Sequence, residues 1–338
     1  MRVSRDELLQ SLEAVAPGLA KKDSVEQSSC FVFYADGRVA TFNDEIACYH
    51  QTPLRNISGA VAADPLRQLL QKLKEEFLEL NVVEHELQVM GQSRRSGIIF
   101  QATVALPLDR VEEPASDSWV EIKPELGDAM ALAGRCASKD GEGSFYLTCI
   151  HFHPKFVEAC DNLQIIRYMV ETGAKTTFLL KAESVNDIAA LGMTEFSETQ
   201  NWAHFRNAAG LMVACRKYVD DFPDISTFLS MDGASPLVLP PGIAESAGNC
   251  SIFTNQNSDN NRIVLHLKSN ACLIEGRGGT GWHQEKIPVQ YNGPEIKFAI
   301  SPKILSDLVA RSTGCMLCPG RLIVDGGTYR YASCLGTV

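Results

Sequence analysis

Two histidines and a cysteine alternate in one short stretch, at Cys149, His151 and His153. Alternate residues of a strand share one face, and imidazole and thiolate groups are common zinc ligands. No further ligand with a motif spacing follows them, so we interpret the histidines as ordinary strand residues. A metal-dependent enzyme built on these three residues is the last-ranked alternative, because no acid, base or nucleophile accompanies them.

Three further stretches share features with reactive motifs. Cys315 and Cys318 have the CxxC spacing but no second pair, and we expect them in the turn between a helix and a strand. The glycine-rich stretch 276–281 has no helix after it and no Lys-Ser/Thr pair, so it predicts a hairpin loop and not a phosphate cradle. Asp220 and Asp221 lie in a linker, where carboxylates are normally solvated. We therefore expect no catalysis, no metal and no cofactor.

The composition is that of an ordinary globular protein. Of the 338 residues, 45% are hydrophobic and 21% are charged, so long disordered segments are not expected. The chain has no run of about 18 apolar residues and no apolar signal core near its N-terminus, so we expect a cytoplasmic protein without a membrane partner. The net charge of −10 argues against a protein that coats nucleic acid with its whole surface, but it allows a local basic face.

The elements that would position any site repeat three times. Helical periodicity opens each third, at residues 5–19, 123–137 and 241–256, and it recurs later, at residues 64–77, 182–191 and 301–311. The later segments begin 118 and 119 residues apart (182 − 64 and 301 − 182), with strand-like runs between. Such a period indicates copies of one supersecondary unit. We therefore predict an α+β chain with three tandem domains, at residues 1–113, 118–222 and 226–338.

Start and turn signals agree with this division. Asp64-Pro65 and Ser301-Pro302 each place a proline directly after a good N-cap residue. The glycines at residues 35–38 and 325–327 predict hairpin turns. Residues 107–117 and 218–235 are rich in proline or acidic side chains and are typical of linkers.

Five stretches, taken in order, resemble one known family. They are residues 34–54 with Thr41-Phe42-Asn43-Asp44, residues 60–73, Val104-Ala105-Leu106-Pro107, Glu158-Ala159-Cys160-Asp161, and residues 218–224, which end in Phe-Pro-Asp. Their order and spacing resemble the bacterial sliding clamp, the β subunit of DNA polymerase III, over essentially the whole chain. The fourth stretch is similar to the family's Ala-Thr-Asp strand in domain two, and the fifth to its link into domain three.

The resemblance implies an architecture and a mechanism. Each sliding-clamp domain has two helices packed on antiparallel sheets, and three domains make half of a six-domain ring. Two chains close head to tail into a homodimer with the helices around the hole. The ring encircles double-stranded DNA without reading its bases, and it tethers DNA polymerase as a processivity factor in DNA replication. The implied partners are DNA, a polymerase, a clamp loader and a second copy of the chain.

Basic residues on or beside the predicted helices are the candidates for the DNA-facing surface. The competing interpretation is an ordinary solvated helix face. The candidates are Arg5, Lys21, Lys22, Arg67, Lys72, Lys74, Lys123, Arg135, Lys139, Lys181, Lys303 and Arg311.

A second surface is implied by the resemblance, because partner peptides of this family dock into an apolar pocket between domains two and three. The positions that match it are Leu163, Gln164, Ile165, Asn249, Cys250 and Leu335. The family's usual Gly-His-Arg-Leu is replaced by Asn-Leu-Gln-Ile at residues 162–165, and its methionine-containing tail by Ser-Cys-Leu-Gly-Thr-Val. The competing interpretation of these positions is that they are plain core residues. For the chain as a whole, two interpretations stay open: a replicative clamp, or a divergent paralogue or mobile-element clamp that serves another DNA enzyme.

Overall fold

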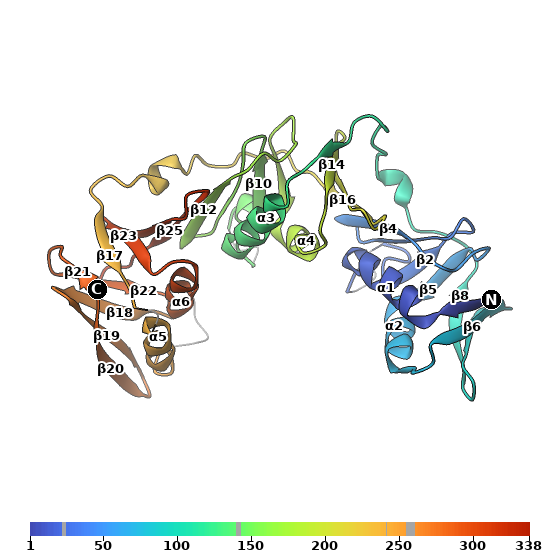
Figure 1. Ribbon diagram of the computed structural model, residues 1–338, viewed down its shortest axis with the longest axis horizontal. Helices are drawn as coiled ribbons and strands as arrows, with labels where there is room; N and C mark the ends of the chain where they lie inside the picture. Colours follow the sequence, from blue (N-terminus) through green and yellow to red (C-terminus); the bar gives the residue numbers. More distant parts are fainter. Residues whose placement is uncertain (22–24, 140–142, 241, 255–260) are drawn as a thin grey trace. The chain divides into compact units, whose positions relative to one another are not determined.

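The computed structural model describes residues 1–21, 25–139, 143–240, 242–254 and 261–338 (Figure 1). Within these ranges the chain is an α+β protein with six α-helices and three antiparallel sheets. It divides into two compact units, of which unit 1 holds Met1–Val157 and Val170–Asp221, and unit 2 holds Glu158–Met169 and Phe222–Val338. None of the described helices has the length and apolar character that a membrane span requires.

The described helices pack as three neighbouring pairs, one pair in each third of the chain. The pairs are α1 (Arg5–Val15) with α2 (Ala63–Lys72), α3 (Glu125–Cys136) with α4 (Ala182–Ile188), and α5 (Ile243–Ser251) with α6 (Pro302–Arg311). The second helices start 119 and 120 residues apart (182 − 63 and 302 − 182). The threefold repeat predicted from the sequence is therefore present in the helices. The predicted segment 241–256 begins and ends at residues outside the described ranges.

Two boundary predictions in the first third are wrong. Helix α2 stops at Lys72, and Phe77 instead opens strand β6, where it pairs with Ser4. Leu66, Leu70, Leu73 and Phe77 have the spacing of one helix face, which is why the sequence predicts a helix as far as Phe77. The pairing of Phe77 with Ser4 makes this residue part of a strand instead. The N-cap of α2 is Ala62 and not Asp64, which lies in the first turn. In α6 the prediction holds, because Ser301 is the N-cap and Pro302 follows it.

One large antiparallel sheet joins the first and middle thirds inside unit 1. Its strand order is β1-β6-β7-β8-β5-β2-β3-β4-β16-β15-β14-β9. The join is made by β4 and β16, which pair over four residues from Ile46↔Cys215 to Tyr49↔Met212. The strands are β1 (Arg2–Ser4), β2 (Cys30–Phe33), β3 (Arg38–Phe42), β4 (Ile46–Gln51), β5 (Gly59–Ala62), β6 (Phe77–Val83), β7 (Glu86–Met90), β8 (Arg95–Gln101), β9 (Val120–Glu121), β14 (Glu195–Glu198), β15 (Trp202–Arg206) and β16 (Met212–Arg216).

The two faces of this sheet are covered differently, because successive strand residues point to opposite sides. Cys48 of β4 points to the side of α1, where Gly18 lies beside its thiol. Ala47 and Tyr49 point to the other side and belong to a second apolar cluster, which is covered by the linker after the first third. That linker contains the short 3-10 helix η2 (Leu108–Arg110), and its Leu106 and Val111 are buried.

Unit 1 also contains β10 (Cys149–His153), which pairs with β13 (Phe178–Lys181). Strand β11 covers Phe156–Cys160. Unit 2 contains two sets of paired strands, in the orders β12-β25-β24-β23-β17-β21 and β20-β19-β18-β22. These strands are β12 (Gln164–Met169), β17 (Ser235–Val238), β18 (Ile263–Lys268), β19 (Ala271–Gly278), β20 (Gly281–Pro288), β21 (Gln290–Tyr291), β22 (Ile296–Ile300), β23 (Gly314–Cys318), β24 (Arg321–Asp325) and β25 (Tyr329–Cys334).

The glycine-rich and CxxC motifs both lie largely in strands of unit 2. Gly278 pairs with Gly281 at the end of the β19–β20 hairpin, so the predicted hairpin is confirmed, but its loop is only Gly279–Thr280, because residues 276–278 and 281 belong to the strands. Cys315 and Cys318 lie on strand β23, which corrects their expected position in a turn. Burial raises the pKa of the Cys315 thiol to about 12, as expected for a core residue and not for a reactive thiol.

Candidate functional site

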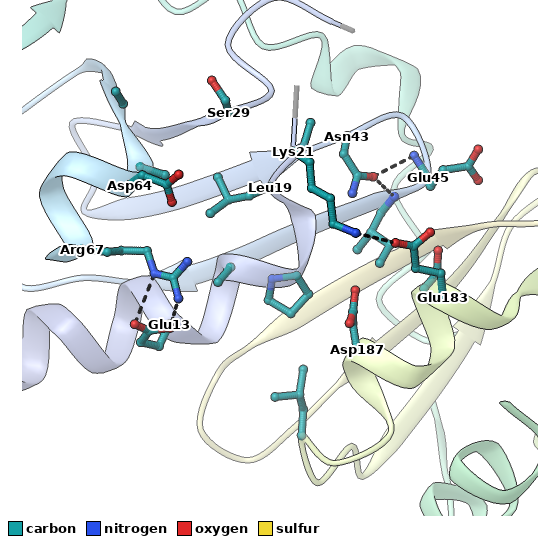
Figure 2. Close-up of a pocket in the computed structure, with 18 of the residues that line it drawn as sticks. Glu13, Leu19, Lys21, Ser29, Asn43, Glu45, Asp64, Arg67, Glu183 and Asp187 are labelled. Atoms are coloured by element: carbon teal, nitrogen blue, oxygen red, sulfur yellow. Dashed lines mark hydrogen bonds and ion pairs between the residues drawn. The ribbon is translucent and has the colours of Figure 1, made fainter. Parts of the chain in front are cut away.

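A cavity of about 970 Å³ lies on the helical side of unit 1 (Figure 2). Its walls come from the end of α1 and its 3-10 extension η1 (Ala16–Gly18), the start of α2, and helix α4. The helices place side chains of both signs here. Five carboxylates line the cavity with three cationic groups; they are Glu13, Glu45, Asp64, Glu183 and Asp187, against Lys21, Arg67 and Lys181.

The cations of this cavity are already paired with carboxylates. Arg67 donates from Nη2 to Glu13 Oε2 at 2.8 Å and from Nε to Oε1 at 3.2 Å, which makes a bidentate pair (Figure 2). Lys21 Nζ lies 3.4 Å from Glu183 Oε1, although its side chain is 92% exposed. Burial and the charge of Glu183 raise the pKa of Asp187, and Lys21 opposes that shift. The lining therefore has more carboxylates than cations and offers no net positive charge to a phosphate.

Lys181 belongs to a compact network at the edge of the same cavity. Its Nζ donates to Glu45 Oε1 at 2.6 Å, and the Tyr218 hydroxyl donates to both oxygens of the same carboxylate, at 2.6 and 2.7 Å. Burial, followed by the hydrogen bond to Glu45, raises the pKa of Tyr218. Glu45 is thus tied by both groups, and Lys181 contributes to the packing of the middle third against the first.

Two other predicted DNA-facing arginines are held by protein groups. Arg5 donates from Nη1 to the Leu73 carbonyl at 2.8 Å and also pairs with Asp6. Arg311 is half-buried at the end of α6, with its guanidinium 4.9 Å from the centre of the Tyr331 ring. Lys22 lies outside the described residues.

A different group of predicted residues is exposed. Within the described ranges, no carboxylate pairs with the ammonium groups of these lysines, which lie at helix ends or just beyond them: Lys72, Lys74, Lys123, Lys139 and Lys303. Arg135, in the last turn of α3, is exposed as well. Sequence position alone does not separate these five lysines from the cations that pair with carboxylates.

The predicted peptide pocket maps onto unit 2, and the structure brings part of it together. The Asp161 carboxylate accepts hydrogen bonds from the backbone N–H groups of Leu163, at 2.6 Å, and Gln164, at 2.8 Å, and so fixes the turn before β12. The Leu163 carbonyl accepts from the Cys334 N–H at 2.8 Å, so this turn lies against the end of β25. Gln164 also accepts from the Tyr331 hydroxyl at 2.9 Å.

Two neighbours complete this surface, and two predicted members lie elsewhere. Ile165 is 8% exposed and pairs with Ala332, and Leu335 follows directly after β25. Asn249 and Cys250 lie on α5, which packs against β19 and β20. The Cys250 side chain is buried, and its burial raises the pKa of the thiol to about 11. Cys250 is therefore placed as a core residue of α5.

Solved structures share this architecture along its whole length. A DnaN sliding clamp, the β subunit of DNA polymerase III, from Bartonella birtlesii matches with a TM-score of 0.87 at 12% identity. The β subunits from Pseudomonas aeruginosa and Thermotoga maritima match with TM-scores of 0.83 and 0.82, at 15% and 18% identity. Each match covers 100% of this chain and 99% of the other. This chain has the sliding-clamp fold. No protein-family model and no curated protein matches its sequence, so the chain shares the clamp fold with a divergent sequence.

Part of the predicted linker 218–235 is ordered near the predicted pocket. The 3-10 helix η4 (Ser226–Leu229) packs against β25. Arg167 of β12 donates to the Ser226 hydroxyl at 3.1 Å, and Phe228 is 51% exposed beside it. The signal for this anchoring was the pair Ile225 and Leu229, which are spaced by four residues and are both buried.

The cysteine and histidines of β10 were the candidate metal ligands of the sequence. Cys149 is buried, and burial raises the pKa of its thiol to about 11. His153 stacks on Phe156 with ring centres 4.0 Å apart, and its Nδ1 accepts from the Lys155 N–H at 3.2 Å. Across the described ranges, no group of three or more His, Cys, Asp or Glu side chains is arranged to hold a metal ion. The metal-enzyme alternative therefore has no assembled site in this part of the chain.

Proposed function

We propose that this protein is a DNA sliding clamp, which encircles double-stranded DNA as a head-to-tail homodimer and tethers a DNA enzyme to it. The observation that carries the proposal is the match of the whole chain to bacterial clamps, with TM-scores from 0.80 to 0.87. Fold alone does not determine function. The contacts with DNA, with a second chain and with a partner enzyme must therefore be argued from the residues on the surface.

Exposed cations on all three helix pairs support the DNA contact. Lys72 and Lys74 lie at the end of α2, Lys123 and Lys139 flank α3, and Lys303 opens α6. Their ammonium groups are free to attract phosphates without reading bases. A net charge of −10 on the whole chain keeps the remaining surface from attracting DNA without discrimination.

Exposed apolar side chains on two open strand edges support the seam of the ring. In strand β8, only Phe100 and Gln101 pair with β5. Within the described residues, the rest of β8, Arg95–Ile99, therefore pairs with β7 on one side and has no strand on the other. Ile99 there is 76% exposed. In unit 2, β20 ends its sheet and carries Trp282, which is 57% exposed. Each edge offers unpaired backbone groups and an apolar anchor to the edge of another chain.

The residues proposed for partner docking depart most from the family pattern. The turn at Leu163–Gln164, the end of β25 and helix η4 would form the docking surface, with Phe228 as its exposed apolar group. Because Asn162–Gln164 and the C-terminal residues depart from the family pattern, we keep a second candidate function, in which the clamp serves a DNA enzyme other than a replicative polymerase.

The decisive experiment separates encirclement from ordinary binding. The protein is placed on nicked circular DNA, with a clamp loader if one is required, and its retention is measured before and after the circle is linearised. We expect retention on the circle and loss on the linear form. Equal retention on both forms contradicts a closed ring.

The seam is tested by mass. Light scattering should give about twice the chain mass of 37.0 kDa, and the substitutions Ile99→Asp and Trp282→Asp should each shift it towards one chain. Val219→Asp is the matched control, because Val219 is 92% exposed and lies on neither edge. A dimer that survives both seam substitutions contradicts this seam.

A further inference from the structure

A cavity of about 440 Å³ opens on the face of the unit 1 sheet opposite to α1. We call it the junction pocket; it is lined chiefly by Tyr34, Arg38, Tyr49, Leu108, Glu113 and Met212. Its volume lies within the range of about 300–1,000 Å³ that is usual for ligand sites. It lies on the opposite face of the sheet from the α1 side, so it is separate from the helical surface proposed to meet DNA.

The walls of the junction pocket are fixed by the linker that follows the first third. Trp202 Nε1 donates to the Arg110 carbonyl at 3.0 Å, and the Asn201 N–H donates to Glu112 Oε2 at 3.0 Å. Val111 is 8% exposed in the apolar cluster beneath. Asn201 and Trp202 therefore hold the linker at Arg110 and Glu112, and a ligand would not have to order this stretch on binding.

Two phenol hydroxyls line the pocket. Tyr34 and Tyr49 are half-buried, and within the described residues neither hydroxyl makes a hydrogen bond. Burial raises the pKa of both hydroxyls, so each remains a neutral donor. Neither hydroxyl is a buried atom without a partner, so water can reach both, and each can donate to a ligand group that replaces this water. Met212, the cross-strand neighbour of Tyr49, adds a flexible apolar wall.

The rim of the pocket is acidic. Asp109, Glu112 and Glu113 contribute three carboxylates against the single guanidinium of Arg38. That guanidinium is already engaged, since Arg38 Nε donates to Asp36 at 2.7 Å and its Cζ lies 5.4 Å from the centre of the Tyr34 ring. An apolar, aromatic floor with an acidic rim is complementary to an apolar group beside a cation.

From these features we propose that the junction pocket is a second docking site, which takes a short extended peptide with an apolar side chain next to lysine or arginine. The apolar side chain would enter between Leu108 and Met212, its backbone carbonyls would accept from Tyr34 and Tyr49, and its cation would meet Glu113. The site has a counterpart in the repeat, because each linker after a third folds into a 3-10 helix, η2 after the first and η4 after the second. The inference does not depend on ring closure.

Fluorescence anisotropy on the full chain tests this proposal with three labelled peptides. They are Lys-Arg-Leu-Phe-Lys, its charge-reversed form Glu-Glu-Leu-Phe-Glu, and Lys-Arg-Gly-Ser-Lys, which lacks the apolar anchor. We expect the first to bind with a Kd below about 1 mM and the other two at least about tenfold more weakly. Glu113→Lys should weaken the first peptide about tenfold and Tyr49→Phe about threefold, with unchanged unfolding midpoints.

The matched control is Glu171→Lys, an equal charge change at an exposed position of unit 1 that does not line the pocket. It should leave the affinity unchanged. The proposal is overturned if the basic peptide does not bind, if the charge-reversed peptide binds as well, or if Glu171→Lys weakens binding as much as Glu113→Lys. If Tyr49→Phe changes the number of chains per particle in light scattering, the proposal is also overturned, because the occupant would then be a second copy of this chain.

Discussion

Arg67 and Lys72 lie on the same helix, yet the structure predicts opposite consequences when their charges are removed. Arg67 is bound to Glu13 by two hydrogen bonds, and both side chains are partly shielded, at 29% and 38% exposure. Lys72 and the nearby Lys74 are exposed, and within the described residues their ammonium groups have no acidic partner. Arg67→Gln should therefore affect folding, and the double substitution Lys72→Gln, Lys74→Gln should affect DNA binding.

The sizes of both effects follow from these contacts. Arg67→Gln loses a charge-assisted pair at a partly wet site, which is worth about 1 kcal/mol of unfolding free energy. The lysine pair should change unfolding by less than about 0.5 kcal/mol. If each lysine meets one phosphate, the slope of log K against log salt should fall by about 0.9 per residue, or about 1.8 in total. Between about 50 and 200 mM salt, the wild type should then lose roughly tenfold more affinity than the variant.

Two measurements check this contrast. Urea unfolding gives the free energies, and anisotropy with a labelled duplex over a salt series gives the slopes. The matched control for the lysines is Gln68→Ala on the exposed side of α2, which should move neither quantity. If Arg67→Gln lowers the salt slope as much as the lysine pair does, or if the lysine pair leaves it unchanged, the division into paired and free cations is wrong.

Three further outcomes are expected. Lys217 and Glu198 form a pair that is 7% and 10% exposed, so Lys217→Met should cost about 3 kcal/mol of unfolding free energy, and adding Glu198→Leu should restore part of it in a double-mutant cycle. Burial lowers the pKa of His204 to about 4, against about 6.5 unfolded, so the folded state binds fewer protons. Stability should be constant above about pH 6.5 and fall by about 2–3 kcal/mol towards pH 4, and His204→Gln should flatten the dependence in urea titrations. Trp202→Phe loses the bond to the Arg110 carbonyl, so it should cost about 1 kcal/mol and speed proteolysis within residues 104–114; unchanged cleavage there argues against an anchored linker.

Much of the fold could be predicted because its helices carry their own local signals. Leu66 and Leu70 lie on one stripe of α2 and are buried as their spacing predicts, and Ser301 with Pro302 marks the start of α6. The strands β1, of three residues, and β9, of two, were not predicted, because such short segments are too short to show an alternation of apolar and polar residues. Their conformation is decided only by the strand with which they pair. The same reason explains why Phe77 was assigned to a helix.

The candidate sites were predictable only where neighbours in sequence decide them. The turn at Leu163, which the family resemblance indicated, is fixed locally, because the nearby Asp161 carboxylate accepts from the N–H groups of Leu163 and Gln164. The pairing of Arg67 with Glu13 spans 54 residues, so no local pattern reports that this cation is already neutralised. The junction pocket joins side chains from residues 34–49, 108–114 and 204–212, and no motif spacing connects them.

The ladder between β4 and β16 has a consequence for how the chain can be divided. Cutting after residue 113 would strip β4 of its partner along Ile46–Tyr49 and leave a row of unsatisfied backbone donors and acceptors, flanked by buried apolar residues. A released first third should therefore seek a replacement strand and self-associate. The shortest N-terminal fragment that keeps this ladder paired must contain both β4 and β16, and so takes in the first and middle thirds together.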